Sequence, residues 1–244
     1  MRRVLFVFTL FALLLAACTA KAAPTEDASD ASSQPTSPPV PTEPSPEPAP
    51  IGPAEEGVVK QLAANLDLQE SDITVVSSEE IEFGDACLGI TMEGVMCAQV
   101  ITPGRIIVLE ANGLQYEYHT SQNGSRVQPA TLALVWKREG GIAGFCDTLV
   151  VFRSGEVLTS NCKSQGEGKT GAFADLLTSR EVQKFNDWMA EFGEAKLDAS
   201  DPKGVADRMV VTVEFFGLGG KSPTESEQRD LFNFAQSLYQ KVAQ

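Results

Sequence analysis

The chain has few of the side chains that most catalytic sites need. Its single histidine, His119, lies in the predicted strand "YEYHT" without an adjacent nucleophile, which is typical of a packing or surface residue. No second histidine is present to complete a Ser-His-Asp set elsewhere. Neither a C-x-x-C pair nor a cysteine–histidine cluster is present, so the sequence predicts no metal site. We therefore expect a protein that is not an enzyme, with no catalytic residues and no cofactor. A hydrolase that uses two carboxylates is a weaker alternative, because the 33 acidic residues could supply such a pair.

Basic residues are also scarce. The chain has 19 lysines and arginines against 33 aspartates and glutamates, and its formal net charge is −14. An acidic surface repels phosphate backbones, so we expect no nucleic-acid partner. The same charge disfavours adhesion to anionic lipid headgroups.

Only one long apolar run is present, at residues 4–15, and it follows the basic pair Arg2 and Arg3. Such a run is too short to span a bilayer and is typical of a secretory signal, with a permanent membrane anchor as the less favoured alternative. It ends in "LAAC", which resembles the lipobox of bacterial lipoproteins. The resemblance implies cleavage after residue 17 and acylation of Cys18. We expect residues 1–17 to be a signal peptide, and the mature chain to be exported and anchored by lipid at the cell membrane or cell surface.

Residues 18–53 contain ten prolines and almost no large apolar side chains. A segment of this composition cannot bury enough surface to offset the entropy of ordering it. Proline-rich chains are extended and act as spacers. We therefore expect a disordered linker that carries no chemistry.

The chain contains five cysteines: Cys18, Cys87, Cys97, Cys146 and Cys162. The lipobox accounts for the first, and an exported chain meets an oxidising compartment in which the other four can pair. Cys87 and Cys97 enclose a short glycine-containing loop. Cys146 and Cys162 flank a predicted hairpin whose turn at residues 153–155 places them directly opposite each other. We expect these two disulfides, with crossed pairing as the less favoured alternative.

Residues 54–129 predict a small α+β domain. Apolar residues recur at helical spacing over residues 58–66, and an alternating strand begins at Ile73. Three antiparallel strands are then expected at residues 97–102, 105–111 and 114–120, separated by a Pro103-Gly104 turn and an Asn112-Gly113 turn. The run "CLG…GVMCAQVITPG…YEYHT" is similar to a small domain of exported bacterial proteins whose role is unassigned. That resemblance implies no function.

Residues 130–244 predict a second α+β domain, in which two helices pack on one sheet. Capping boxes mark the two helix starts, where a threonine precedes a glutamate by three residues. The expected elements, in chain order, are a strand at 131–139, a hairpin over 145–162, a helix that starts after Thr178 with Glu181, a strand at 208–216 and a helix that starts after Thr224 with Glu227. The whole chain is therefore expected to have an α+β fold with two small antiparallel sheets, each packed by one or two helices.

The first strand and the hairpin of this second domain are joined by a segment with very small side chains. The segment consists of Gly140, Gly141, Ile142, Ala143, Gly144 and Phe145. Glycine permits positive φ and close backbone approach, which predicts a bulge or tight bend. The same small residues could also form a contact surface, and the two interpretations are compatible.

The sequence around this segment carries a family resemblance. "WKREGGIAGFCDTLVVFRSGEV", the helix start "LTSREVQKF", the strand "DRMVVTVEFFG" and the closing helix together resemble the emfourin family over residues 131–244. Arg138 to Gly144 is the most specific part, whereas Cys146, Cys162 and Arg208-Met209 depart from the family pattern. The resemblance implies a small inhibitor of thermolysin-like zinc metallopeptidases. We expect residues 140–145 to bind or inhibit an extracytoplasmic metallopeptidase of this kind. The alternative is a non-inhibitory cell-envelope lipoprotein that binds another protein or a ligand.

Overall fold

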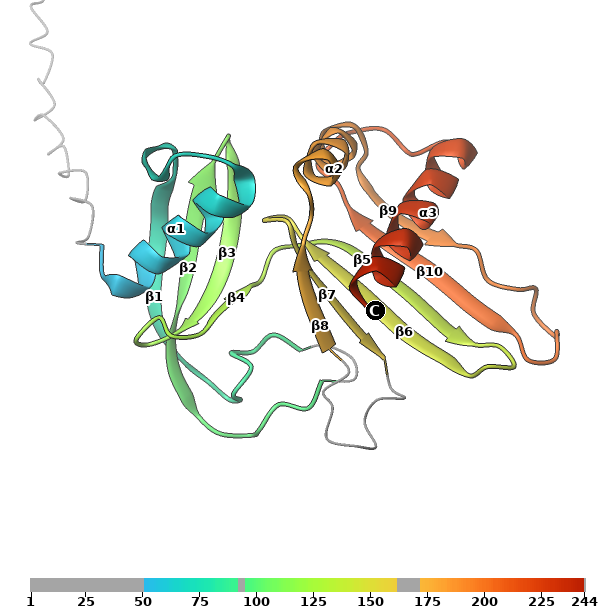
Figure 1. Ribbon diagram of the computed structural model, residues 1–244, viewed down its shortest axis with the longest axis horizontal. Helices are drawn as coiled ribbons and strands as arrows, with labels where there is room; N and C mark the ends of the chain where they lie inside the picture. The colour runs from blue at the N-terminus through green and yellow to red at the C-terminus, as the bar shows by residue number, and fades with distance from the viewer. Residues whose placement is uncertain (1–50, 92–94, 162–171, 244) are drawn as a thin grey trace, which may run out of the picture. The chain divides into compact units, whose positions relative to one another are not determined.

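The structure is a computed structural model that describes residues 51–91, 95–161 and 172–243 (Figure 1). The predicted signal peptide at 1–17, the lipidation residue Cys18 and most of the predicted linker at 18–53 lie outside the described residues. The same holds for residues 162–171, which include Cys162. Those predictions stay predictions.

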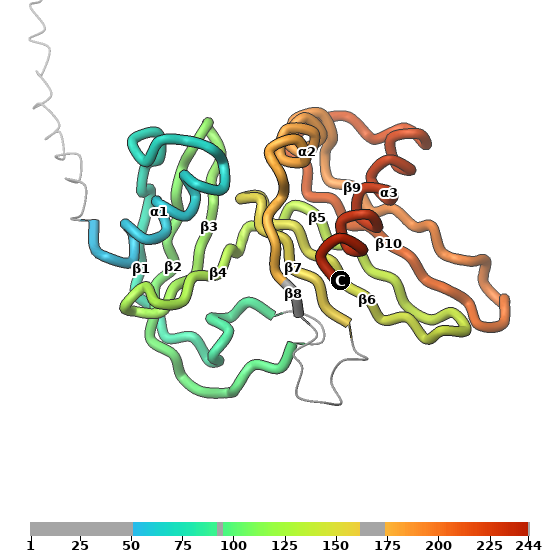
Figure 2. Tube along the Cα trace, viewed as in Figure 1, coloured from blue at the N-terminus to red at the C-terminus, as the bar shows by residue number. Residues whose placement is uncertain are grey.

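The described residues confirm the predicted α+β class. They form two antiparallel sheets, one of four strands in the order β1-β2-β3-β4 and one of six in the order β8-β7-β6-β5-β10-β9 (Figures 1 and 2). One α-helix accompanies the first of these sheets and two accompany the second. Both sheets belong to one compact unit, and each has its own hydrophobic core.

The first sheet is covered by a single helix. The elements are α1 (Pro53–Leu66), the short 3-10 helix η1 (Glu70–Asp72), β1 (Thr74–Phe83), β2 (Thr102–Ala111), β3 (Leu114–Ser121) and β4 (Val127–Pro129). Proline at the first position of α1 suits a helix start, because that residue has no intrahelical N–H bond to make. Val58 and Leu62 are fully buried against Ile107, Leu109 and Tyr118 of the sheet. The apolar stripe predicted from the sequence therefore forms this core.

The predicted turn at Pro103-Gly104 is wrong. Both residues lie inside β2, and the segment 97–102, predicted as a strand, enters β2 only at Thr102. The place expected for that strand is taken by β1, which pairs with β2 along its length. The predicted Asn112-Gly113 turn joins β2 to β3 as expected, and both of its residues have positive φ.

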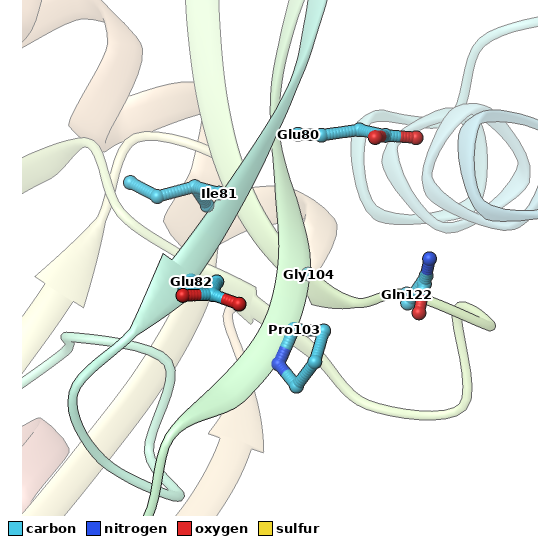
Figure 3. A pocket seen from close by; sticks show the side chains of 6 residues that line it. All are labelled: Glu80, Ile81, Glu82, Pro103, Gly104 and Gln122. Carbon is cyan, nitrogen blue, oxygen red and sulfur yellow. The ribbon is translucent and has the colours of Figure 1, made fainter.

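Gly104 is required in β2 because other groups occupy the space that a side chain would need. A Cβ at this position would overlap the carbonyl oxygen of Thr120 and come within 2.7 Å of the Phe83 ring. Glycine inside a strand often marks such a close approach. Figure 3 shows Gly104 at the wall of a hollow on this sheet, with Glu80 and Glu82 on the same side of β1.

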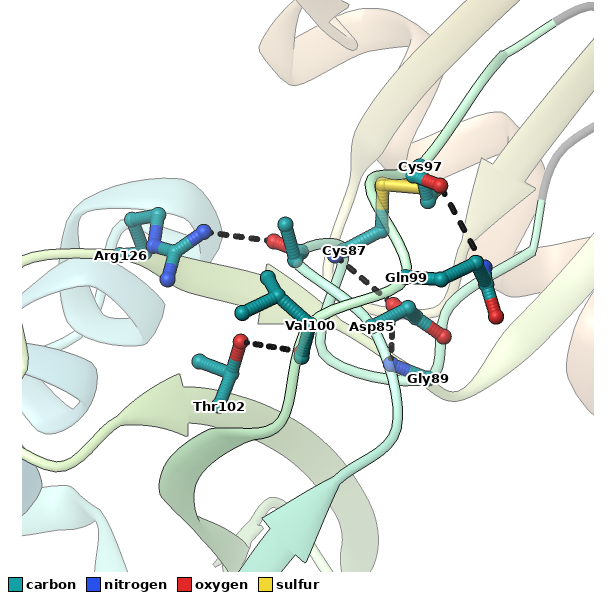
Figure 4. The surroundings of a disulfide bond; sticks show 9 residues. Asp85, Cys87, Gly89, Cys97, Gln99, Val100, Thr102 and Arg126 are labelled. Atoms are coloured by element: carbon teal, nitrogen blue, oxygen red, sulfur yellow. Dashed lines mark hydrogen bonds between the residues drawn. A yellow bond between two sulfur atoms is a disulfide. The ribbon is translucent and has the colours of Figure 1, made fainter.

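A disulfide closes the long connection between β1 and β2. Cys87 and Cys97 are bonded, as predicted, with their Cα atoms 5.6 Å apart (Figure 4). The Asp85 carboxylate accepts hydrogen bonds from the backbone N–H groups of Cys87 and Gly89, at 2.8 and 3.2 Å. Arg126 donates to the carbonyl of residue 86 at 2.6 Å. These contacts fix the start of the connection beside the sheet.

The second sheet carries two helices. Its strands are β5 (Leu132–Gly140), β6 (Phe145–Phe152), β7 (Glu156–Asn161), β8 (Ala172–Leu176), β9 (Glu194–Asp198) and β10 (Met209–Phe216), and the helices are α2 (Ser179–Glu191) and α3 (Glu225–Val242). Trp136 and Leu149 of the sheet share one core with Phe185 of α2 and Leu238 of α3. The sequence had not predicted the short strands β4, β8 and β9.

Both predicted capping boxes are present. Thr178 Oγ1 accepts from the N–H of Glu181, and the Glu181 carboxylate accepts from the N–H of Thr178 at 2.7 Å. Thr224 and Glu227 repeat the arrangement at the start of α3. Each box satisfies backbone donors that lack partners within the helix.

The predicted turn at residues 153–155 joins β6 to β7. Asp147 pairs with Asn161 across this hairpin, which is the register that the second disulfide prediction assumes. Because Cys162 lies outside the described residues, the Cys146–Cys162 bond stays a prediction.

Within the described part of the chain, the helices are too short or too polar to cross a membrane.

The packing around Gly104 leads to a stability prediction. We expect Gly104→Ala to lower the free energy of unfolding by about 2 kcal/mol or more, because the methyl group forces apart two strands and an aromatic ring. Gly84→Ala is the matched control, since a Cβ there meets nothing within 4 Å, and its cost should be within about 0.5 kcal/mol. Urea denaturation measures both values. Equal stability of the two variants would contradict this account of Gly104.

Candidate functional site

The residues predicted to bind form the connection between β5 and β6. We call residues 140–145 the hairpin tip. Gly140 and Phe145 face each other as the last strand pair, and the N–H of Gly144 donates to the carbonyl of Gly141 at 2.9 Å. Ile142 stands at the turn with 92% of its surface exposed. The structure therefore brings all six predicted residues together, with one aliphatic side chain pointing into solvent.

Two of the glycines have backbone reasons to be glycine. Gly140 has φ +81°, and a Cβ on it would overlap the carbonyl oxygen of Arg208. The N–H of Gly141 donates to that same carbonyl at 3.2 Å. These contacts attach the tip to the start of β10. Only glycine fits at position 140, and the φ of +69° at Gly141 also favours glycine. The predicted tight bend is confirmed here.

A charged pair lies under the tip on the face of the sheet that carries the helices. Arg138 and Asp147 occupy opposite positions of β5 and β6, and Arg138 Nε donates to the carboxylate at 2.9 Å. The guanidinium carbon stands 3.9 Å from the centre of the Phe145 ring, within cation–π range. Because Asp147 is only 7% exposed, water weakens this ion pair less than it would at the surface.

The pair is tied to the last helix. The hydroxyl of Tyr239, on α3, donates to the other oxygen of Asp147 at 2.8 Å, and its ring packs 5.2 Å from that of Trp136. Burial, the hydrogen bond to Asp147 and the negative charge of that carboxylate together raise the pKa of Tyr239 to about 12. The hydroxyl therefore stays protonated and donating throughout the neutral range. We call Arg138, Asp147 and Tyr239 the base of the tip. These three residues connect β5, β6 and α3.

A second loop lies beside the tip. Residues 199–208 join β9 to β10, and Asp201 closes this loop by accepting from the N–H of Met209 at 2.9 Å. Arg208 Nε donates to the Asp201 carbonyl at 2.7 Å. Val205 is 49% exposed. The Arg208 carbonyl, which accepts the hydrogen bond from the Gly141 N–H, therefore belongs to a loop that is held by its own hydrogen bonds.

Candidate catalytic side chains elsewhere are engaged in structural contacts. Both ring nitrogens of His119 are in hydrogen-bond contact, with the Leu88 carbonyl oxygen at 2.7 Å and a Glu117 carboxylate oxygen at 3.0 Å. The two carboxylates beside the hollow of Figure 3 are Glu80 and Glu82, and Glu80 is paired with Arg105 at 2.6 Å. These contacts give His119 and Glu80 a structural role.

Only one group of side chains in the described residues has a spacing that would suit a metal ion, namely Asp85, Cys87 and Cys97. The two sulfur atoms are joined in the disulfide, so neither is a thiolate ligand.

Sequence reasoning missed the base of the tip. Arg138 and Asp147 become opposite neighbours once the four-residue loop between β5 and β6 is assumed, so strand register could have revealed the pair. No local signal points to Tyr239, which lies 92 residues beyond Asp147.

A second carboxylate, Glu156, was also missed. It accepts hydrogen bonds from side chains of the first sheet and of α1.

Comparison with known protein families gives one match. Residues 55–129 match a family described as a domain of unknown function (DUF8738). The matched residues run from the first turn of α1 to the end of β4 and cover less than half of the chain. No curated protein and no solved structure matched the chain.

The tyrosine environments predict an unusual alkaline titration. Burial raises the pKa of all three tyrosines, Tyr116, Tyr118 and Tyr239. Each folded-state pKa lies above the unfolded value of about 10. The protonated tyrosines therefore make their full contribution to the free energy of unfolding below pH 10, and this contribution is lost as the pH rises through the folded-state pKa. We expect less tyrosinate absorbance at pH 10 than free tyrosine shows, with Tyr239 ionising only near pH 12, and a rise in absorbance that accompanies unfolding. One tyrosine that ionises reversibly near pH 10, with circular dichroism unchanged, would contradict the packing described here.

Proposed function

We propose that this protein is a non-catalytic lipoprotein, anchored through Cys18, that binds an extracytoplasmic thermolysin-like metallopeptidase through its hairpin tip and thereby inhibits it. The observation that carries the proposal is the exposure of Ile142 on a turn whose backbone and base are both held in place. The remaining support is the resemblance of residues 131–244 to the emfourin family.

The physical argument concerns the cost of binding. Ordering a flexible loop at an interface consumes binding free energy, so a preorganised loop binds more tightly. Here the Arg208 carbonyl fixes one side of the tip, and the Arg138–Asp147 pair fixes the strands below it. An exposed branched aliphatic side chain on such a support suits a cleft that accepts bulky apolar groups. The resemblance implies a cleft of that kind in the peptidase.

Access to the target follows from the predicted leader and linker. A lipid on Cys18 would hold the protein at the cell membrane or cell surface, outside the cytoplasm. An extended linker of about 35 residues would let the folded part reach roughly 100 Å from the bilayer. The proposed partner is therefore a peptidase that is exported or faces the cell exterior.

A second candidate function rests on a different surface. Three side chains of the connection between β1 and β2 are exposed, with Met96 at 89%, Val100 at 52% and Ile101 at 68%. Grouped exposed apolar residues often mark protein-binding surfaces. They favour the alternative of a non-inhibitory cell-envelope lipoprotein that binds another protein or a ligand.

Substitution of one exposed residue tests the inhibitor proposal. We expect the purified protein to slow hydrolysis by a thermolysin-like peptidase at micromolar concentration. Ile142→Asp should weaken that inhibition by about tenfold or more, because it places a charge in an apolar pocket. The matched control is Leu218→Asp, which changes a leucine that is 51% exposed and far from the tip in the sequence.

Thermal denaturation should show both variants as stable as the parent, since neither side chain belongs to a core. Absence of inhibition by the parent would remove the proposal. An equal loss of inhibition in both variants would remove the tip as its site.

A further inference from the structure

The carboxylate of Glu156 receives four hydrogen bonds from neutral donors. Its Oε1 atom accepts from Gln61 Nε2 at 3.0 Å, from Asn65 Nδ2 at 2.6 Å and from the Tyr118 hydroxyl at 3.2 Å. Its Oε2 atom accepts from the hydroxyl of Ser154. An ionised carboxylate has about four acceptor positions over its two oxygens, so it can accept several donors at once, and here Oε1 takes three of them.

Three of the four donors come from the region that matches the family of unknown function. Gln61 and Asn65 lie one helical turn apart on α1, at the spacing that places side chains on the same face. Tyr118 reaches the same point from β3 and is fully buried. Burial and the negative charge of Glu156 both raise the pKa of Tyr118, so its hydroxyl remains a donor. A helix and a strand of one small domain thus direct three donors at one place.

The acidic residue is supplied by the second sheet. Glu156 is the first residue of β7, directly after the turn at residues 153–155. A second contact comes from the same turn, in which Arg153 Nη1 donates to the Gln115 carbonyl at 3.0 Å. The turn therefore presents its carboxylate to the first domain and is held there by a neighbouring bond.

Neutral donors that converge in this way suit a carboxylate ligand. Hydrogen bonds to an ionised acceptor are shorter and stronger than those between neutral groups, so three N–H and O–H donors that converge on one point favour a carboxylate there. Without an acceptor between them, the donors that packing shields from water would lose their partners.

We infer that Gln61, Asn65 and Tyr118 form a carboxylate-binding site of the 55–129 domain, and that Glu156 occupies this site from within the same chain. This assignment gives the domain a binding role, namely to hold a glutamate presented on a turn. It does not rest on the hairpin tip or on the proposed peptidase.

Chemical rescue tests the site in the full chain. Glu156→Ala removes the ligand and should lower the melting temperature by about 5 °C or more, because four donors lose their acceptor. Acetate then serves as the probe. We expect added sodium acetate to raise the melting temperature of Glu156→Ala in a saturable way, beyond the effect of sodium chloride at equal ionic strength. The parent protein, whose site is filled, should respond equally to the two salts.

Glu156→Ala combined with Asn65→Ala is the matched control, and the additional effect of acetate should be lost or strongly reduced in this double variant. The proposal is overturned if acetate does no more than chloride for Glu156→Ala, or if it helps the double variant equally.

If Glu156→Ala does not fold, a double-mutant cycle of Glu156→Gln and Asn65→Ala replaces the rescue. We expect the two changes to be coupled by about threefold or more in the unfolding equilibrium constant. Additive effects would overturn the assignment.

Discussion

Buried and half-buried carboxylates that accept several hydrogen bonds hold the helices and strands of this protein together. Glu55 on α1 meets donors from β1 and β2, Asp147 on β6 meets donors from β5 and α3, and Glu156 on β7 meets donors from α1 and β3. Such groups are stable only with hydrogen-bond partners. Burial alone would raise the pKa of Glu55, but the bond from Ser78, backbone donors and the charge of Arg105 together lower it. Each carboxylate thus fixes the position of a helix on a sheet. Apolar contacts are not directional and define that position less sharply.

Much of the fold could be predicted from the sequence because the deciding interactions are local. A threonine and a glutamate three residues apart define the starts of α2 and α3 through bonds within a single turn. The Asn112-Gly113 pair determines the β2–β3 hairpin through its own backbone preference. A three-residue turn centred on Ser154 sets the register of β6 and β7. In these cases the residues that carry the signal are also the residues that interact.

The incorrect predictions concern features that depend on distant groups. Proline and glycine at 103–104 have the composition of a turn, but Gly104 is required by Phe83 and Thr120, which approach it from other strands. The strands β8 and β9 have five residues each, too few for alternation to identify them. At the candidate site, the glycines pointed to the tip, whereas the bond from Tyr239 to Asp147 appears only when α3 is packed on the sheet.

The small side chains of the hairpin tip and its one large exposed side chain have separate causes. Gly140 is required because the Arg208 carbonyl lies where its side chain would have to be, and Gly141 has a φ of +69°, a conformation that favours glycine. The fold does not require Ile142, because it is 92% exposed and belongs to neither hydrophobic core. A single exposed aliphatic residue is ordinary on a protein surface. What distinguishes this one is its support, since the strands beneath it are tied to α3 by the Asp147 carboxylate. At this turn the glycines serve the backbone, whereas Ile142 contributes to neither core, so the proposed binding can be tested at Ile142 without changing the residues that shape the turn.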